Sequence, residues 1–187
     1  MLQHDLMDLV FYVTCQILGI DASKNPQNIR PLYSVPNPTA LRNPHNDMVF
    51  YLAQFGDAPI NRQIDVTTEG AGTDTITQIT KHVRSLTFNW QLYGDNGMEN
   101  ADKIRIGLMR PDVQNMLEQN NISLIPDIPE PVYVPELIGM QWYSRYDLSA
   151  NFNQLVIDTS TLSTIASADV VIETEKGVVN KCSTSAQ

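Results

Sequence analysis

The residues from Leu86 to Arg105 read LTFNWQLYGDNGMENADKIR and largely decide the fold that we expect. In the first half of this stretch, apolar and polar side chains alternate, which is the period of a half-buried strand. The alternating apolar residues are Leu86, Phe88, Trp90 and Leu92. Two glycines then end the strand, and apolar residues recur at helical spacing between Met98 and Met109. The stretch predicts a strand with one buried face, followed by a helix that packs on the sheet.

The same strand is expected to begin far upstream, because residues 73–93 form an unusually long run of β-type residues. Ile79 and Val83 have the opposite parity from the later apolar residues of the run. A side chain changes face when the parity shifts by one, so we expect a bend or a bulge near residues 83–85. The first half of the strand is then expected to extend beyond the sheet.

The remaining elements follow from shorter patterns. Apolar residues at steps of three and four predict a helix over residues 2–18, which Gly19 follows as a cap. Pro111 suits the first position of a second central helix. Further strands are expected at residues 48–55, 122–124, 137–147, 152–158 and 168–173, with a turn at 149–151 that joins two of them as a hairpin. From Lys176 onward the pattern is lost, and a loose polar tail is expected over 176–187.

Two segments are expected to lack regular structure. Residues 24–47 carry five prolines among Asn, Ser and Arg, which disfavours helix and central strand and predicts an extended arm. Long segments of this kind usually have a function, and in an oligomer the arm would lie along the sheet edge of a neighbour. Folding of residues 24–47 onto their own subunit would reject that hypothesis. Residues 56–72 are glycine-punctuated and are expected to be a long loop, since no phosphate-binding glycine motif is present.

Composition limits the class of protein. With 187 residues, 42% hydrophobic and 18% charged, the chain has enough apolar residues for one core, so we expect a single domain over residues 1–175. No apolar run approaches the roughly 20 residues of a membrane helix, and a soluble protein is expected. The formal charge of −9 argues against a surface that grips nucleic acid. It fits either simple solubility or an acidic wall along which DNA slides, and charge alone does not choose between these.

The two cysteines show neither metal-type nor redox-type spacing. Cys15 lies in the apolar pattern of the first helix, where a thiol usually behaves as a small core residue. Cys182 lies in the polar tail and is expected to be free.

The residues that usually build catalytic or metal sites are scattered. The histidines have no ligand spacing, and no nucleophile motif accompanies them; they are His4, His45 and His82. Three carboxylates bracket the glycine-punctuated segment and could pair as acid and base or bind a divalent cation, although a solvated loop explains them better; they are Asp65, Glu69 and Asp74. We therefore predict no catalytic residue, no cofactor and no metal site.

The densest group of interface-type residues lies at 142–147, WYSRYD. Tyr, Trp and Arg dominate interface hot spots, because they combine a large contact area with few rotatable bonds or a planar donor group. Trp142 is expected to point inward, and Arg145 to be paired or to reach outward. The candidate subunit-interface residues are Tyr33, Arg42, Arg62, His82, Arg84, Tyr143, Arg145 and Tyr146.

Two stretches resemble the phage neck terminator family: residues 86–105, already quoted, and residues 141–148, QWYSRYDL, with Phe152 after them. In that family a strand ending in Tyr-Gly leads through a turn to a helix with Ala and Ile-Arg, and a later strand carries an aromatic residue, an Arg and an acidic residue. The matching positions are Tyr93, Gly94, Ala101, Ile104, Arg105, Trp142, Arg145 and Asp147. The resemblance covers roughly residues 46–175, in matching order.

The resemblance implies an α+β fold like that of tail terminators, with a mostly antiparallel sheet flanked by the N-terminal helix and a central helix pair. It implies a structural virion protein at the head-tail junction that forms a ring, usually of six subunits. Its partners would be further copies of itself, the tail tube protein and the connector or a head-completion protein. DNA would pass through the lumen without sequence-specific binding, and no membrane is involved.

The alternatives are another neck or head-tail joining protein, an enzyme, and a small-ligand-binding module. An enzyme would need a concave site with perturbed acids and bases or a cofactor, and a binding module would need an enclosed apolar pocket.

Overall fold

The computed structural model describes residues 3–24, 26–33, 43–70, 75–163, 167–174 and 177–185, the last two ranges as backbone. The chain divides into two compact units. The first consists of Met1–Asn61 and Val83–Leu155, and the second of Arg62–His82 and Val156–Gln187. Each unit is described separately, and the expectation of a single domain stays a prediction.

Three α-helices belong to the first unit: α1 (Gln3–Leu18), α2 (Gly97–Gly107) and α3 (Pro111–Glu118). All three confirm helices expected from the sequence. Gly19, with a φ of 68°, follows α1 in the left-handed conformation expected of its cap. Pro111 stands at the start of α3, where its missing N–H costs no helical hydrogen bond. Short 3-10 turns add η1 (Ala22–Lys24) and η2 (Pro59–Arg62).

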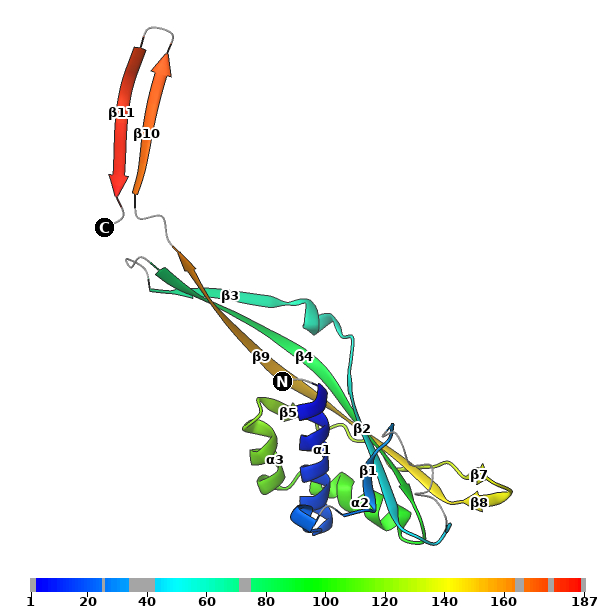
Figure 1. Ribbon diagram of the computed structural model, residues 1–187. Coiled ribbons are helices and arrows are strands. Elements are labelled where there is room, and N and C mark those ends of the chain that lie inside the picture. The colour runs from blue at the N-terminus through cyan, green and yellow to red at the C-terminus, as the bar shows by residue number, and fades with distance from the viewer. Residues whose placement is uncertain are drawn as a thin grey trace. The chain divides into compact units, whose positions relative to one another are not determined.

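The main sheet is mixed and mostly antiparallel, which with the helices confirms the α+β class. Its strand order is β1-β2-β4-β9-β5, and β3 and β6 pair with β4 and β9 off this path. The strands are β1 (Ile29–Pro31), β2 (Met48–Phe55), β3 (Ile64–Glu69), β4 (Thr75–Tyr93), β5 (Ile122–Leu124), β6 (Val132–Tyr133) and β9 (Arg145–Ser163). Only β1 is shown to run parallel to its neighbour, β2. The helices of the first unit lie together on one face of the sheet (Figure 1).

The core of the first unit lies between this face and the helices. Phe88 of β4 and Phe152 of β9 stack with ring centroids 4.3 Å apart. Trp90 is fully buried, and its indole N–H donates a 2.9 Å hydrogen bond to Thr14 Oγ1 on α1. The Thr14 hydroxyl in turn donates to the carbonyl of Val10, so the polar atoms in this part of the core are satisfied. Cys15 is buried among them, as the helical pattern predicted.

The first half of β4 pairs with β3, and the second half pairs with β2. This change of partner falls between His82 and Leu86, where the sequence indicated a bend or a bulge. Both registers are regular, and the irregularity itself stays a prediction. Residues 56–72 were expected to be a loop, which is wrong, because η2 and β3 lie within them. Strand β3 consists of Val, Ile and Thr between acidic residues, and the nearby glycines obscured this β-type composition.

The hairpin expected around residues 149–151 is also wrong. Strand β9 runs without interruption from Arg145 to Ser163. The hairpin lies earlier, between β7 (Glu136–Ile138) and β8 (Gln141–Tyr143). Gly139 and Met140 form its turn with φ values of 56° and 66°, the pair of positive angles typical of a tight hairpin turn.

The arm expected over residues 24–47 is corrected in part. Residues 29–31 form strand β1, which pairs with β2 of the same subunit, so they do not reach a neighbour. The amide of Leu32 also donates to the carbonyl of Tyr51 in β2. Residues 34–42 lie outside the described part of the chain.

The second unit contains β3, the first half of β4, the end of β9, and the pair β10 (Ser167–Thr174) and β11 (Gly177–Ser185). Strand β10 confirms the strand expected at 168–173. The loose tail expected from Lys176 is wrong, since β11 pairs antiparallel with β10 along most of its length. Polar residues can pair through their backbones without an apolar pattern, which is why the sequence gave no strand signal there.

Candidate interaction surfaces

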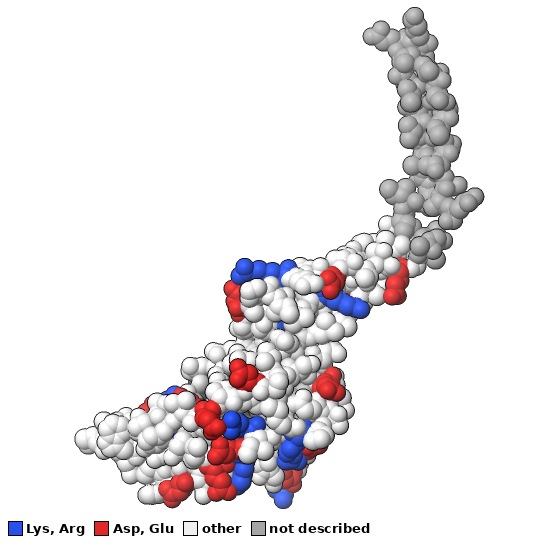
Figure 2. Space-filling view, turned by 180° about the vertical axis from the view of Figure 1, so that it is seen from behind, with Lys and Arg blue, Asp and Glu red and all other residues white. Residues whose placement is uncertain are grey.

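The β7–β8 hairpin has one packed face and one exposed face. Leu137 and Trp142 are directly opposite each other, and their side chains are 55% and 65% exposed. Met140 at the turn is 95% exposed. Seen from behind in Figure 2, the hairpin forms a largely uncharged protrusion. Large apolar side chains grouped in this way are typical of a contact surface.

The prediction that Trp142 points inward is wrong. Its neighbour Tyr143 takes the inward position, where it is only 4% exposed and joins Met48 and Tyr93 in a small apolar cluster. Adjacent residues of a strand point to opposite faces, so packing of Tyr143 forces Trp142 into solvent.

Charged side chains connect the start of β7 to the start of β9. The Arg145 guanidinium donates to both oxygens of Asp147, from Nε at 2.7 Å and from Nη2 at 2.6 Å. Its Nη1 donates to Glu136 Oε2 at 3.3 Å, and the hydroxyl of Tyr93 donates to the same oxygen at 2.7 Å. Bidentate pairing of this kind fixes orientation as well as adding energy. The expectation that Arg145 is paired is confirmed, and the pairing anchors the base of the hairpin.

The same network changes the acidity of its members. Burial, together with the hydrogen bond to Glu136, raises the pKa of Tyr93 well above its usual value, so the phenol stays protonated. The hydrogen bonds to Asp147 raise the pKa of Arg145, which is therefore a permanent cation. Groups held in one protonation state orient neighbours but do not exchange protons near neutral pH.

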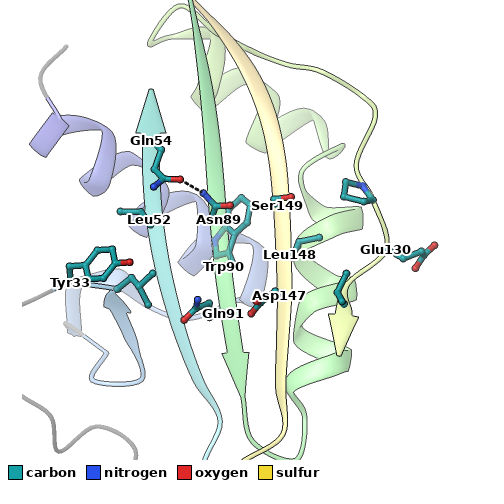
Figure 3. Close-up of a pocket in the computed structure, with 13 residues that line it drawn as sticks. Tyr33, Leu52, Gln54, Asn89, Trp90, Gln91, Glu130, Asp147, Leu148 and Ser149 are labelled. Carbon is teal, nitrogen blue, oxygen red and sulfur yellow. Dashed lines mark hydrogen bonds between the residues drawn. The ribbon is translucent and has the colours of Figure 1, made fainter. Parts of the chain in front are cut away.

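A shallow groove of about 350 Å³ crosses the sheet face opposite the helices. Figure 3 shows polar side chains of β2, β4 and β9 at its floor, with a hydrogen bond of 3.2 Å from Asn89 to Gln54. Its two carboxylates, Glu130 and Asp147, are already paired, with Arg105 at 3.0 Å and with Arg145. The groove offers hydrogen-bonding groups to a partner but no acid and base pair.

The other predicted interface residues are distributed over the chain. Tyr146 lies beside Tyr133, with ring centroids 5.2 Å apart, near the hairpin base. Tyr33 is 77% exposed at the rim of the groove. Arg84 donates to Gln154 Oε1 at 2.8 Å and lies 4.4 Å above the ring of Phe55.

Two more of the predicted residues, Arg62 in η2 and His82 in β4, belong to the second unit, and Arg42 lies outside the described residues. The structure thus brings Tyr143, Arg145 and Tyr146 together at the base of the hairpin. None of these residues is tested as an interface, and their role stays a prediction.

Sequence reasoning missed Glu136 and Tyr93 as members of one network. Forty-three residues separate them, and their link through a carboxylate oxygen depends on tertiary packing. Both quoted stretches meet there, since Tyr93 belongs to the first and Arg145 to the second. A signal for the hairpin was available in Gly139, which interrupts an otherwise largely apolar run.

Within the described ranges, no three His, Cys, Asp or Glu residues are arranged to hold a metal ion. Asp65 and Glu69 are exposed on β3, and Asp74 lies outside those ranges. His4 pairs with Asp8 at 3.1 Å and His45 with Asp95 at 2.9 Å, both at exposed positions. None of the helices described has the length and apolarity to cross a membrane.

Comparison with curated proteins found none that matches this chain. Comparison with protein families gave a match to the phage neck terminator protein family over residues 54–177. The matched region includes the end of β2, all of β4 and β9, both central helices and the hairpin. The chain therefore belongs to the phage neck terminator protein family, whose members are structural, non-enzymatic virion proteins at the head-tail junction.

Proposed function

We propose that this protein forms a closed ring of six subunits, the number that its family resemblance implies, and that this ring ends the tail tube and joins it to the connector. The observation that carries the proposal is the β7–β8 hairpin, with an exposed apolar face on a base fixed by Arg145. A largely uncharged protrusion with exposed apolar side chains has little use on an isolated subunit and is suited to insertion between neighbouring proteins. Its partners are the tail tube protein and the connector or a head-completion protein.

The charge of the chain supports the same proposal. With a net charge of −9, the subunit repels phosphate overall, so DNA passes through the lumen without being held. The groove carboxylates are paired with arginines, so that face can offer hydrogen bonds to a partner but no acid and base pair.

The test combines oligomeric state with tube binding. The full chain is analysed by size-exclusion chromatography with light scattering and by electron microscopy, alone and with purified tail tubes or connectors. We expect closed rings, either free or on the ends of tubes, and tubes that stop growing once capped. A chain that stays monomeric with both partners would overturn the proposal.

Trp142→Ser tests the hairpin, and Ile106→Ser is the matched control, because Ile106 is 66% exposed on α2. Neither substitution removes a buried contact, so both variants are expected to melt at the temperature of the unaltered protein. Trp142→Ser should weaken the capping of tubes or the binding of connectors at least tenfold, and Ile106→Ser should leave both unchanged. Equal binding by both variants would show that the hairpin takes no part in the contact.

A further inference from the structure

The two units differ in how their sheet edges are protected against pairing with another chain. In the first unit the outer edges are formed by very short strands: β1 and β5 have three residues each, and β6 has two. Strand β1 ends at Pro31, which cannot donate a backbone hydrogen bond. Short edge strands and proline are the usual means by which proteins prevent pairing with another chain.

The second unit has long edges without these protections. Strand β3 has six residues, no proline, and every residue exposed. Beyond Leu155, residues 156–163 of β9 likewise contain no proline. Strands β5 and β6 pair with β9 only before that point, and β3 pairs with β4 alone among the described strands. Unprotected edges of this length lead to association in solution.

Two backbone hydrogen bonds show which amides face these edges. The amide of Gly56 donates to the carbonyl of Ser85, so Ser85 and, with regular alternation along β4, its other odd-numbered residues face the side of the sheet on which β2 and β3 lie. Since β3 pairs odd residues with odd residues, its even residues Ile64, Val66 and Thr68 point their backbone groups outward.

The same reasoning applies to β9. The amide of Leu155 donates to the carbonyl of Asn121, on the side of β9 away from β4. The odd residues that follow it, Ile157, Thr159 and Thr161, therefore point their N–H and C=O groups to the outer edge. Each edge thus presents alternate residues with both a donor and an acceptor.

We propose that β3 of one subunit pairs with residues 156–163 of β9 in the next copy of this chain, which joins the subunits head to tail. The inference rests on the proposed ring and names the contact that closes it. Two different edges on one subunit are what a ring needs, because a head-to-tail contact requires two complementary surfaces. Pairing of every β3 with a β9 leaves neither of these two edges free, as in closed barrels.

Charge favours pairing of β3 with residues 156–163 of β9 over pairing of β3 with a second β3. Strand β3 carries Asp65 and Glu69, so two β3 strands side by side would bring four carboxylates together. Residues 156–163 carry only Asp158 and are otherwise apolar, Ser or Thr.

The topology also fixes the direction of the pairing. Strand β3 is antiparallel to β4. Strand β4 is antiparallel to β9, as the arrows in Figure 1 show and as the side-chain bonds Arg84–Gln154 and Thr87–Asn151 require. Strands β3 and β9 therefore run in the same direction within a subunit. Rotation about a ring axis that runs along the strands preserves direction, so the pair between subunits is parallel.

Disulfide cross-linking tests both partner and direction. Within one subunit β4 separates β3 from β9, so facing residues lie about 9–10 Å apart, or two strand spacings. A disulfide requires Cα atoms within about 7 Å, so any cross-link between these strands joins two subunits. In a Cys182→Ser background, Val66→Cys is combined in turn with single cysteines at positions 157–161.

We expect a ladder of covalent multimers on a non-reducing gel, strongest for one position of β9. When Val66→Cys is replaced by Thr68→Cys, the strongest position should move two residues toward the C-terminus, because the strands are parallel. A shift of two residues in the opposite direction overturns the proposal, as do covalent dimers from Val66→Cys alone, which would indicate β3 beside β3. Rings of the unaltered protein without any ladder would overturn this contact and leave the proposed function standing, whereas absence of rings counts against the proposed function.

A second variant avoids cysteine. Val66→Pro removes an outward amide and suits an edge strand whose N–H faces solvent, so the subunit itself should keep its melting temperature. The control Val66→Thr keeps the amide and the β-branched side chain. We expect Val66→Pro to abolish rings and Val66→Thr to retain them, and rings formed equally by both would refute the pairing.

Discussion

The hydrogen bond between Trp90 and Thr14 gives a sharp test of how α1 is held on the sheet. Both side chains are completely buried, and the indole N–H lies 2.9 Å from the Thr14 hydroxyl oxygen. Thr14→Val preserves the shape of the side chain and removes the acceptor. The indole N–H then has no partner, and burial keeps water from replacing it.

A buried donor without an acceptor costs about 1–3 kcal/mol. Burial of the extra methyl group offsets part of this, so the net loss is expected toward the lower end of that range. For a chain of this length the loss lowers the melting temperature by roughly 2–12 °C. The hydroxyl of Thr14 also donates to the carbonyl of Val10, but this carbonyl lies in a helix and keeps its helical partner.

A double-mutant cycle with Trp90→Phe isolates the bond. Phe has no N–H, so Thr14→Val in that background should be neutral or slightly stabilising. Urea unfolding of the four proteins should give a coupling free energy of about 1 kcal/mol or more. If Thr14→Val costs the same with Phe as with Trp at position 90, the hydrogen bond does not explain the buried threonine.

Three other outcomes are expected. Gly94→Ala should lower the free energy of unfolding by about 2 kcal/mol or more, since φ is 101° there and a Cβ would lie 2.6 Å from a backbone oxygen; unchanged stability in a urea titration would contradict this. Burial raises the pKa of Tyr51 to about 12 and also raises the pKa of Tyr93. The unfolded chain therefore releases these protons at a lower pH than the folded protein does. The stability that the two protonated phenols contribute is fully present below about pH 10 and falls as the pH rises above it. The slope should be smaller in the Tyr51→Phe, Tyr93→Phe double variant, and an equal slope in urea titrations between pH 9 and pH 11, roughly the range set by the tyrosine pKa values, would refute this origin. Arg145→Lys should destabilise by about 1 kcal/mol, because Lys cannot bind Asp147 in a bidentate manner, and thermal melts matching those of the unaltered protein would refute the network's contribution.

The fold was predictable where side-chain periodicity and burial coincide. The alternation that ends at Tyr93 predicted β4, and the three- and four-residue steps predicted α1 and its cap at Gly19. In both elements one face packs in the core, and burial of that face is what imposes the pattern.

Prediction failed where strands are held by backbone pairing rather than by a buried face. Strand β11 carries no alternating apolar pattern, and the short alternation of Ile64 and Val66 in β3 stands next to a glycine-rich stretch that favoured a loop. At the hairpin, the inward position of Tyr143 depends on Met48 and Tyr93, which are distant in sequence. The cluster at 142–147 was found because of its composition, whereas the assignment of faces within it required the tertiary contacts.

The distribution of buried residues differs between the two units. Every buried hydrophobic residue of the described chain belongs to the first unit, and no described residue of β3 or of β9 beyond Leu155 is buried. The first unit can therefore be stabilised by its own core, whereas the second unit has backbone hydrogen bonds but little apolar burial of its own. Strands without a core usually depend on further partners for stability. Stability that comes from a partner subunit rises with protein concentration. If the proposed ring forms, we expect the first unit to keep its stability before assembly and the strands of the second unit to gain stability from the contact between subunits.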